Sequence, residues 1–393
     1  MKLFQGKMKS CFAAFVFCLV LCSESKLLCM AEGSSKPQLL SESYVLMEAS
    51  TGTVLHEKDM NKVLPPASIT KIMTLFLIYE ALEDGTITKE TVVTTTEHAA
   101  SMGGSQVYLE AGEQQTVETL IKCISISSAN DACVAMAEHL SGTEEAFVEE
   151  MNKKAKELGM SNTHFVNCCG LDVDGHVSTA YDIALMSAEL MSRFPDVMQY
   201  TTTRIDTMTH TTNKGTTEFG LTNTNKLLSS YEGITGLKTG STGKARYCLS
   251  ATATRNGIDM IAVVLSAPDT KTRFKEAATL LTYGFSKCKI YTDNHEDMEP
   301  VRVPVENSME QELTLVPKEQ FKYISADRGD FSGITEEIVV YEKITAPVVK
   351  GDELGAVIYK LDDVEIGQIA LIAEADIPKA TYKDYLMKIL SYF

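Results

Sequence analysis

The 393-residue sequence predicts an α+β protein, and three observations support this fold class. The expected elements run in the order of a strand hairpin, several helices, a series of strands and a closing helix, which suits an antiparallel sheet covered by helices. Hydrophobic residues make up 44% of the chain, enough for packed cores. Residues 297–376 form short alternating runs rich in valine, threonine and glutamate, which indicate a separate small β-sandwich domain.

Residues 1–31 have the outline of a secretory signal peptide. Three lysines precede the apolar stretch Cys11–Cys22, and Ala31 closes a small-residue cleavage pattern. The apolar stretch is shorter than the roughly 20 residues that a membrane-spanning helix needs. We therefore expect this segment to be removed and the protein to be exported.

The expected mature chain is strongly acidic and contains six cysteines. Loss of residues 1–31 removes four lysines and one glutamate, so the formal net charge falls from −17 to −20. Such a chain lacks the basic patch that nucleic acids require. No cysteine forms a CxxC pair or a metal-ligand pattern with the histidines, so we expect neither a metal nor a cofactor. The adjacent Cys168 and Cys169 have no assigned role.

The first domain begins with a hairpin and a set of helices. Tyr44–Glu57 alternates β-forming residues around a Thr-Gly turn. Apolar residues at helical spacing then run from Ser68 until Asp84-Gly85 ends them. Thr116–Ile126 and Asp131–Leu140 are also expected to be helical, with Asn130 as the N-cap of the second.

The later part of this domain has the pattern of antiparallel strands. We expect strands in the segments 233–242, 247–254 and 259–267, with Asn256-Gly257 as a hairpin turn. A helix over Arg273–Phe285 should close the domain.

The C-terminal segment 378–393 predicts a short amphipathic helix. Its apolar residues fall mainly on one face, and lysines fall mostly elsewhere. Aromatic and lysine flanks favour a membrane interface over the alternative, docking on the surface of the protein itself.

The sequence PPASITKIMT places Ser68 three residues before Lys71. At helical spacing the two side chains share one face. A serine hydroxyl becomes a good nucleophile when a neighbour takes its proton, and a lysine can do so in its neutral form, which desolvation or a nearby cation favours. The pair alone is weak evidence, because an N-cap serine with a solvated lysine is common.

Two further motifs strengthen this interpretation. Ser128-Ala129-Asn130 lies in the break between two helices, and Lys238-Thr239-Gly240 lies near the end of an expected strand. The order SxxK, SxN and KTG matches the serine enzymes that react with penicillin.

The chain resembles the D-alanyl-D-alanine carboxypeptidases, which are low-molecular-mass penicillin-binding proteins. Besides the three motifs, the segments GGSQVYLEAGE, GLDVDGHVSTAYDIA and GLKTGSTGKARYCLSATAT read like that family in order and spacing. The resemblance implies a β-lactamase/transpeptidase-like catalytic domain over residues 41–290, followed by the β-sandwich domain and the amphipathic helix. It also implies that this helix holds the enzyme at the outer face of the cytoplasmic membrane.

The resemblance also implies roles for the acylation machinery. Ser68 would be the acylated nucleophile, Lys71 its general base and Ser128 a proton relay toward the leaving D-alanine. The backbone N–H groups of Ser68 and Ser241 would form the oxyanion hole.

The substrate-binding roles come from the same resemblance. Asn130 would hold Lys71 and the peptide amide of the substrate. Lys238 and Thr239 would bind the terminal carboxylate, and Gly240 would let the substrate run beside the strand. Arg273 would lie near the carboxylate site, although a solvated residue in the first turn of a helix is an equally good interpretation.

The implied activity is removal of the terminal D-alanine from peptidoglycan stem pentapeptides, with acylation and inhibition by β-lactam antibiotics. Three alternatives remain. A β-lactamase on the same fold would need a deacylating glutamate, whereas the loop NCCGLDVDGH offers Asp172 and Asp174. A DD-endopeptidase would use the same chemistry. A non-catalytic peptidoglycan-binding protein would be expected to have lost Ser68, Lys71 or Lys238.

Overall fold

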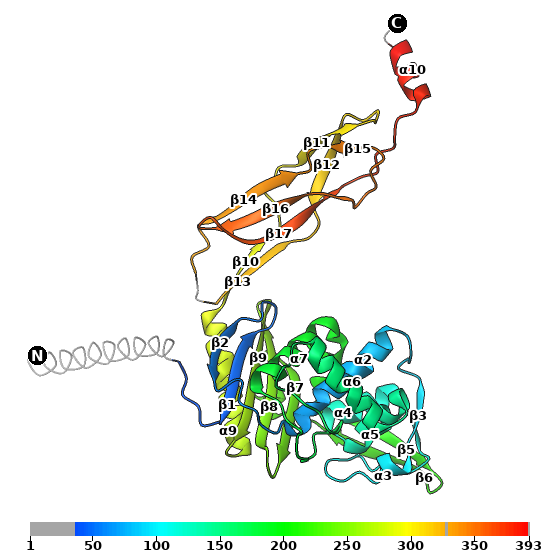
Figure 1. The fold of residues 1–393 in the computed structure, drawn as a ribbon, viewed down its shortest axis with the longest axis vertical. Helices are drawn as coiled ribbons and strands as arrows, with labels where there is room; N and C mark the ends of the chain where they lie inside the picture. The colour runs from blue at the N-terminus through cyan, green and yellow to red at the C-terminus, as the bar shows by residue number, and fades with distance from the viewer. Residues whose placement is uncertain (1–35, 327–328, 392–393) are drawn as a thin grey trace, which may run out of the picture. The chain divides into compact units, whose positions relative to one another are not determined.

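The computed structural model describes residues 36–326 and 329–391, so the expected signal peptide lies outside the described residues. The chain divides into two compact units, one ending at Ser286 and the other beginning at Lys287 (Figure 1). Strands and helices are mixed in the first unit and strands dominate the second, which confirms the predicted α+β class.

A five-stranded antiparallel sheet forms the centre of the first unit, in the order β2-β1-β9-β8-β7. The predicted hairpins are present in it. The turn between β8 and β9 has positive φ at both Asn256 and Gly257, as a tight two-residue hairpin turn requires. The strands are β1 (Ser43–Glu48), β2 (Val54–Lys58), β7 (Ile234–Thr242), β8 (Arg246–Arg255) and β9 (Ile258–Ala267).

The two faces of this sheet are covered by different helices (Figure 1). On β1, Val45 and Met47 belong to the core shared with the helical cluster. Leu46, between them, lies against Gly284 of α9 (Thr270–Lys287). The helix α9 begins earlier than predicted because Asp269 accepts a hydrogen bond from the backbone N–H of Thr272 and so caps it.

The helical cluster buries most of the apolar side chains of the first unit. Figure 1 shows it on the side of the sheet where α7 packs against β1 and β9. Its main helices are α2 (Lys71–Glu83), α4 (Val117–Ile126), α5 (Asn130–Ser141), α6 (Glu144–Glu157) and α7 (Ala180–Arg193). Shorter elements are η1 (Ala67–Thr70), β3 (Val92–Thr94), α3 (Glu97–Ala100), β4 (Gln114–Thr116), η2 (Pro195–Val197), α8 (Met198–Thr201), β5 (Ile205–Thr212), β6 (Gly215–Thr222) and η3 (Lys226–Ser229).

The second unit contains a six-stranded sheet, in the order β14-β16-β17-β12-β11-β15, and the pair β10-β13. The rings of Phe321 and Tyr359 stack with centroids 3.7 Å apart, so strands of the two sheets share one core. The strands are β10 (Lys289–Asp293), β11 (Val301–Glu306), β12 (Glu312–Pro317), β13 (Phe321–Ser325), β14 (Ile334–Val340), β15 (Ile344–Thr345), β16 (Glu353–Leu361) and β17 (Val364–Ala373). Because β10 pairs with β13, this unit begins before the expected start at residue 297.

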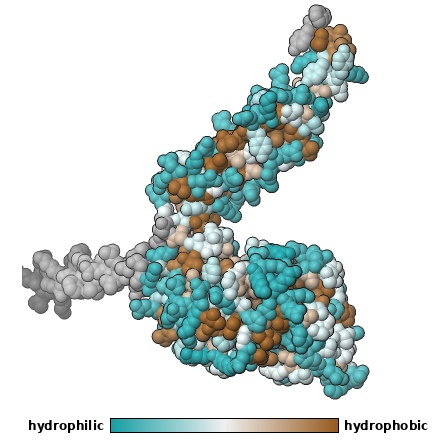
Figure 2. Space-filling view, viewed as in Figure 1, coloured by the Kyte–Doolittle hydropathy of each residue, from teal (hydrophilic) through white to brown (hydrophobic). Residues whose placement is uncertain are grey.

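The last described element is the helix α10 (Tyr382–Leu390), inside the segment predicted to be amphipathic. Thr381 and Asp384 form a capping box that fixes its first turn. None of its residues is buried, and Figure 2 shows apolar side chains on its surface. Among the described residues, no helix has both the length and the hydropathy needed to span a bilayer.

Candidate active site

Ser68 lies in the short turn η1, immediately before α2. The turn is 3₁₀ rather than α-helical, so the α-helix begins at Lys71 and not at Ser68 as predicted. Ala67 has a φ of +50°, an uncommon conformation for a residue with a side chain. The turn still brings the two motif residues together, because Lys71 Nζ donates a hydrogen bond of 3.1 Å to Ser68 Oγ.

Lys71 is completely buried and its amine has three acceptors. Besides Ser68 Oγ, Nζ donates to Asn130 Oδ1 at 2.6 Å and to the carbonyl oxygen of Cys169 at 2.8 Å. In the part of the chain that the structure describes, no carboxylate forms an ion pair with this lysine. Its position is thus set by neutral hydrogen-bond acceptors, which fix the amine beside the serine without neutralising a charge.

Ser128 lies in the break between α4 and α5 and has a φ of +61°. A left-handed backbone is costly for a serine and is found mainly where the surroundings impose it. The conformation aims the side chain at β7, where Ser128 Oγ accepts a hydrogen bond of 2.8 Å from Lys238 Nζ.

Asn130 is not the N-cap of α5, contrary to the prediction. It is the first residue of the helix, and Ala129 occupies the cap position without a side-chain bond. The Asn130 side chain instead accepts from Lys71 and donates to the carbonyl oxygen of Gly103 at 2.7 Å. These tertiary partners compete successfully with the local cap.

Lys238 and Thr239 are buried on β7. Burial, together with the neighbouring amine of Lys71, holds the pKa of Lys238 well below its usual range. Thr239 Oγ1 lies 2.6 Å from Thr224 Oγ1. The pair Lys238–Ser128 links the second motif to the third as directly as Lys71–Asn130 links the first to the second.

Gly240 lets β7 approach the nucleophile turn closely. A Cβ at this position would lie 2.9 Å from the backbone nitrogen of Ser68 and 3.0 Å from the carbonyl oxygen of Pro66. Ser241 follows on the same strand, paired with Tyr247 of β8, and its side chain is exposed. At position 240, glycine is therefore required by the close packing of β7 on the nucleophile turn rather than by an unusual φ.

Arg273 is buried. The alternative expectation, a solvated residue in the first turn of a helix, is therefore wrong. Its Nη1 donates to the carbonyl oxygen of Gly240 at 2.9 Å and to that of Cys248 at 3.2 Å. The guanidinium of α9 thus supports β7 and β8 directly behind the KTG motif.

Sequence reasoning missed two residues that hold the site together. The buried carboxylate of Asp131 accepts from the backbone N–H groups of Val107 and Leu109, which fixes the loop that also contacts Asn130. His176 Nδ1 accepts from the backbone N–H of Val166, so Nε2 carries the proton and donates to Thr70 Oγ1 at 2.8 Å. Burial lowers the pKa of His176 to about 4, which keeps this ring neutral.

The loop containing Cys169 passes close beside the nucleophile turn. Gly170 has a φ of +87°, and a Cβ there would lie 1.9 Å from the carbonyl oxygen of Ala67. The two aspartates of this loop point elsewhere. Asp172 accepts from Thr242 Oγ1 at 2.7 Å, and the exposed Asp174 pairs with Lys244 at 2.9 Å.

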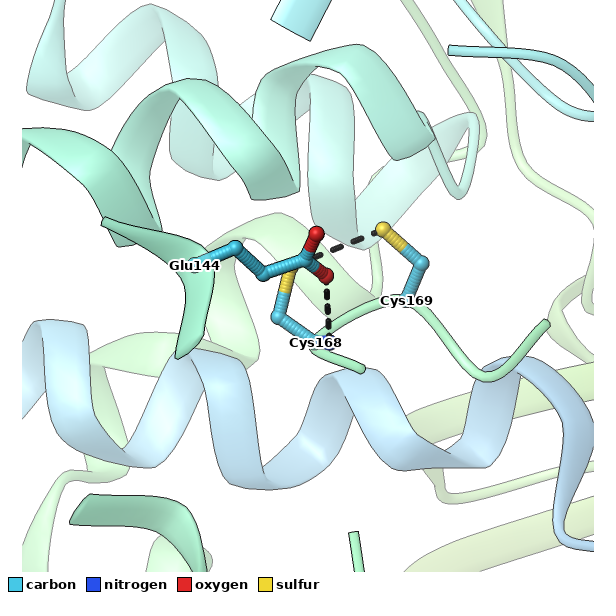
Figure 3. A group of neighbouring side chains, drawn as sticks. All are labelled: Glu144, Cys168 and Cys169. Atoms are coloured by element: carbon cyan, nitrogen blue, oxygen red, sulfur yellow. Dashed lines mark hydrogen bonds between the residues drawn. The ribbon is translucent and has the colours of Figure 1, made fainter. Parts of the chain in front are cut away.

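Two cysteines of this loop and a glutamate of α6 form a group of potential metal ligands, although the sequence indicated no metal pattern. Glu144, Cys168 and Cys169 have ligand atoms that all lie within 4.8 Å of one another (Figure 3). The sequence could not indicate this group because Glu144 is on α6, far from the cysteine pair along the chain. Burial raises the pKa of the Cys168 thiol, whereas hydrogen bonds with Cys133 and Cys168 lower that of Cys169.

Comparison with known families gives two matches that together span most of the chain. Residues 30–269 match the family described as D-alanyl-D-alanine carboxypeptidase. Residues 285–379 match the family described as the C-terminal domain of penicillin-binding protein 5.

Individual proteins agree with these family matches. The chain is 41% identical to the D-alanyl-D-alanine carboxypeptidase DacF of Bacillus subtilis, with 88% of each chain covered. It is 33% identical to DacC of Escherichia coli, covering 88% of this chain and 86% of that one. Among solved structures, penicillin-binding protein 5 of Haemophilus influenzae has 30% identity and a TM-score of 0.68, with 88% of this chain and all of that chain covered.

Proposed function

Because the chain belongs to the D-alanyl-D-alanine carboxypeptidase family, it is a serine-type carboxypeptidase, and we propose that Ser68 is the residue that becomes acylated. The observation that carries this assignment is the hydrogen bond between Lys71 Nζ and Ser68 Oγ in a buried site. Of the described side chains, Lys71 is the base in direct contact with this hydroxyl.

We propose the following acylation step. Ser68 Oγ attacks the carbonyl carbon of the penultimate D-alanine while Lys71 takes its proton. For this step the amine is neutral, so it accepts the hydrogen bond of the Ser68 hydroxyl and donates to Asn130 and the Cys169 carbonyl. The negative charge that develops on the carbonyl oxygen is stabilised by the backbone N–H groups of Ser68 and Ser241. The close approach of Gly240 to Ser68 supports this pairing, because Ser241 is the next residue on β7.

Departure of the terminal D-alanine requires a proton at its amine nitrogen. Ser128 is proposed to deliver it, since its hydroxyl is hydrogen-bonded to Lys238 on the same side of the site. Water then hydrolyses the ester on Ser68 and releases a peptide shortened by one residue. A β-lactam acylates the same hydroxyl, but its leaving group stays attached, so inhibition is expected.

Recognition of the terminal carboxylate is assigned to Lys238 and Thr239. A carboxylate beside Lys238 favours the charged ammonium, which burial otherwise opposes. Arg273 is proposed to act as a positioning residue, because its contacts are with the carbonyl groups of β7 and β8. Asn130 is proposed to hold Lys71 and the peptide amide of the substrate together.

The alternatives named above have less support. The loop aspartates Asp172 and Asp174 are bound to Thr242 and Lys244, so neither is placed as a deacylating base for a β-lactamase. Ser68, Lys71 and Lys238, whose loss would indicate a non-catalytic protein, are all present. Lys71 is hydrogen-bonded to Ser68, and Lys238 is hydrogen-bonded to Ser128. An endopeptidase would share this chemistry and differ in its substrate.

We also propose that the enzyme acts outside the cytoplasmic membrane and that α10 holds it at the membrane surface. The helix exposes Tyr385, Leu386, Ile389 and Leu390, each with more than 40% of its surface accessible. An amphipathic helix with this exposure and lysine neighbours suits the interface between headgroups and acyl chains.

The deciding experiment measures release of free D-alanine from a diacyl-L-Lys-D-Ala-D-Ala peptide by the purified mature chain. Benzylpenicillin and Ser68→Ala should each abolish release, whereas Ser161→Ala, at an exposed serine, should not. Release that persists in Ser68→Ala would contradict the assignment of the nucleophile. Penicillin labelling of Ser68 without D-alanine release would instead favour an endopeptidase.

A further inference from the structure

We infer that Cys168, Cys169 and Glu144 form a binding site for one thiophilic divalent cation of the zinc class. The two Sγ atoms and a carboxylate oxygen lie within 4.8 Å of one another (Figure 3). This inference does not depend on the proposed reaction at Ser68.

The separation of the two sulfur atoms fits a shared metal. Cys168 Sγ and Cys169 Sγ are 3.6 Å apart. With zinc–sulfur bonds of about 2.3 Å, tetrahedral geometry places two sulfur ligands about 3.8 Å apart. A disulfide fits less well, since consecutive Cα atoms are about 3.8 Å apart and disulfides usually need about 4.4 to 6.8 Å. The pair is therefore better arranged to share an ion than to form a covalent bond.

The backbone that carries the two thiols is held on several sides. The backbone N–H of Cys168 donates to Glu144 Oε1 at 3.0 Å, and its carbonyl oxygen accepts from Thr74 Oγ1 at 2.6 Å. The backbone N–H of Cys169 donates to Asn167 Oδ1 at 3.1 Å. Ligands that are already fixed lose little conformational freedom when a metal binds.

The donor set selects for a borderline or soft cation. Two thiolates exclude magnesium and calcium, which prefer oxygen ligands. Both thiols are buried, and 14% of the Glu144 side chain is exposed, so the carboxylate lies between solvent and the sulfur atoms. A divalent cation would neutralise most of the charge of two thiolates and one carboxylate. Two basic side chains contact the group: Lys71 donates a hydrogen bond to the carbonyl oxygen of Cys169, and His98 Nε2 lies 3.9 Å from Glu144 Oε2.

The fourth coordination position can be filled by water. Sites with three protein ligands and one further position are common for zinc.

Cadmium provides a direct test, because thiolate-to-cadmium charge transfer gives an ultraviolet absorption band. The reduced mature chain should bind one Cd²⁺ with this band, measured by equilibrium dialysis and absorption, and Zn²⁺ should compete. Cys168→Ala and Cys169→Ala should each weaken binding at least about 100-fold, and Glu144→Gln about 10-fold. Cys123→Ala is the matched control, since Cys123 is also buried but contacts Met208 instead.

Wild-type protein without the thiolate–cadmium band would overturn the inference, as would a band that persists in both cysteine variants. If the alanine variants fold poorly, Glu144→Gln decides the matter. This change keeps an acceptor for the Cys168 N–H at a partly exposed side chain, and unchanged cadmium affinity in it would also be contradictory. Because no peptide substrate is involved, failure here is separate from failure of the carboxypeptidase assignment.

Discussion

The two units of the chain differ in what they bury. The first unit buries charged side chains, among them Lys71, Lys238, Arg273 and Asp131. Within the described residues of the second unit, Ser325 is the buried polar residue and no charged side chain is buried. Burial of a charge is costly unless it is paired or hydrogen-bonded. Burial of these charges therefore lowers the stability of the first unit, and the second unit avoids this cost. Three of the four charged residues belong to the motifs or contact them.

The second unit instead exposes apolar side chains that proteins usually bury. Its helix α10 leaves all its large apolar side chains at least partly exposed, with Tyr382 at 85% and Ile389 at 56%. Single exposed apolar residues are ordinary, but a set on one short helix indicates a surface that something else covers. The first unit thus buries charged side chains, and the second exposes apolar ones, at the places where their functions are proposed.

Removal of the buried amine should give the largest effect. Lys71→Ala should lower the rate of acylation by benzylpenicillin about 10² to 10⁴-fold, because the serine loses its proton acceptor. Labelling by fluorescent penicillin measures the rate, and circular dichroism checks the fold. Lys154→Ala is the control, since Lys154 is a partly buried lysine paired with Glu80 rather than with the motifs. Near-normal labelling of folded Lys71→Ala would contradict the assigned base.

The buried imidazole of His176 makes a prediction for pH dependence. Its pKa is about 4 in the folded chain and near 6.5 when exposed, so the unfolded state binds a proton first as the pH falls. The stability that neutral His176 contributes is fully present above pH 6.5 and is lost as the pH falls toward 4. Over this range the wild type should lose about 3 kcal/mol more than His176→Gln.

Urea unfolding followed by circular dichroism at several pH values measures this difference. The chain has no tryptophan, so fluorescence is a weaker probe. All other titrating groups are common to both proteins and cancel in the comparison. Equal loss of stability in wild type and variant would show that His176 has the same pKa in the folded and unfolded states.

Sequence predicted the chemistry of the first unit better than its geometry. The spacing of Ser68 and Lys71 indicated the pair, because three residues bring side chains together in either kind of helix. It could not distinguish a 3₁₀ turn from an α-helix, because that depends on tertiary packing of η1 against β7 and Gly170. The N-cap predicted for Asn130 failed for the same reason, since Lys71 and Gly103 supply partners that are distant in sequence.

Residues that act through other residues were the hardest to predict. The support that Arg273 gives to β7 spans 33 positions along the chain, and His176 reaches Thr70 over 106. The strands of the central sheet were predictable from their apolar runs and turn residues, whereas the pair β5 and β6, whose residues are mostly not buried, was not predicted. No sequence pattern predicts the cluster of Glu144, Cys168 and Cys169, because these residues come together only when the chain folds.

The packing of β7 on the nucleophile turn can be tested with a single methyl group. Gly240→Ala would place a Cβ 2.9 Å from the backbone nitrogen of Ser68, so β7 must move away. We expect acylation to slow about 10-fold and stability to fall by about 1 to 3 kcal/mol. Gly243→Ala is the matched control, because a Cβ there meets nothing within 4 Å. Equal rates in the two variants would show that this contact does not position the site.

The exposed apolar helix of the second unit should have the smallest effect on catalysis, because its expected role is in membrane binding. Leu386→Glu should weaken binding to vesicles of phosphatidylcholine and phosphatidylglycerol about 10-fold, because loss of one buried leucine costs about 1.5 kcal/mol or more. Deletion of residues 378–393 should abolish vesicle binding while D-alanine release from a soluble peptide continues, since the described motif residues all lie in the first unit. Val364→Glu, at another exposed apolar residue of the second unit, should leave both unchanged. Cosedimentation measures the binding, and a wild-type chain that never sediments with vesicles would refute the membrane role of α10.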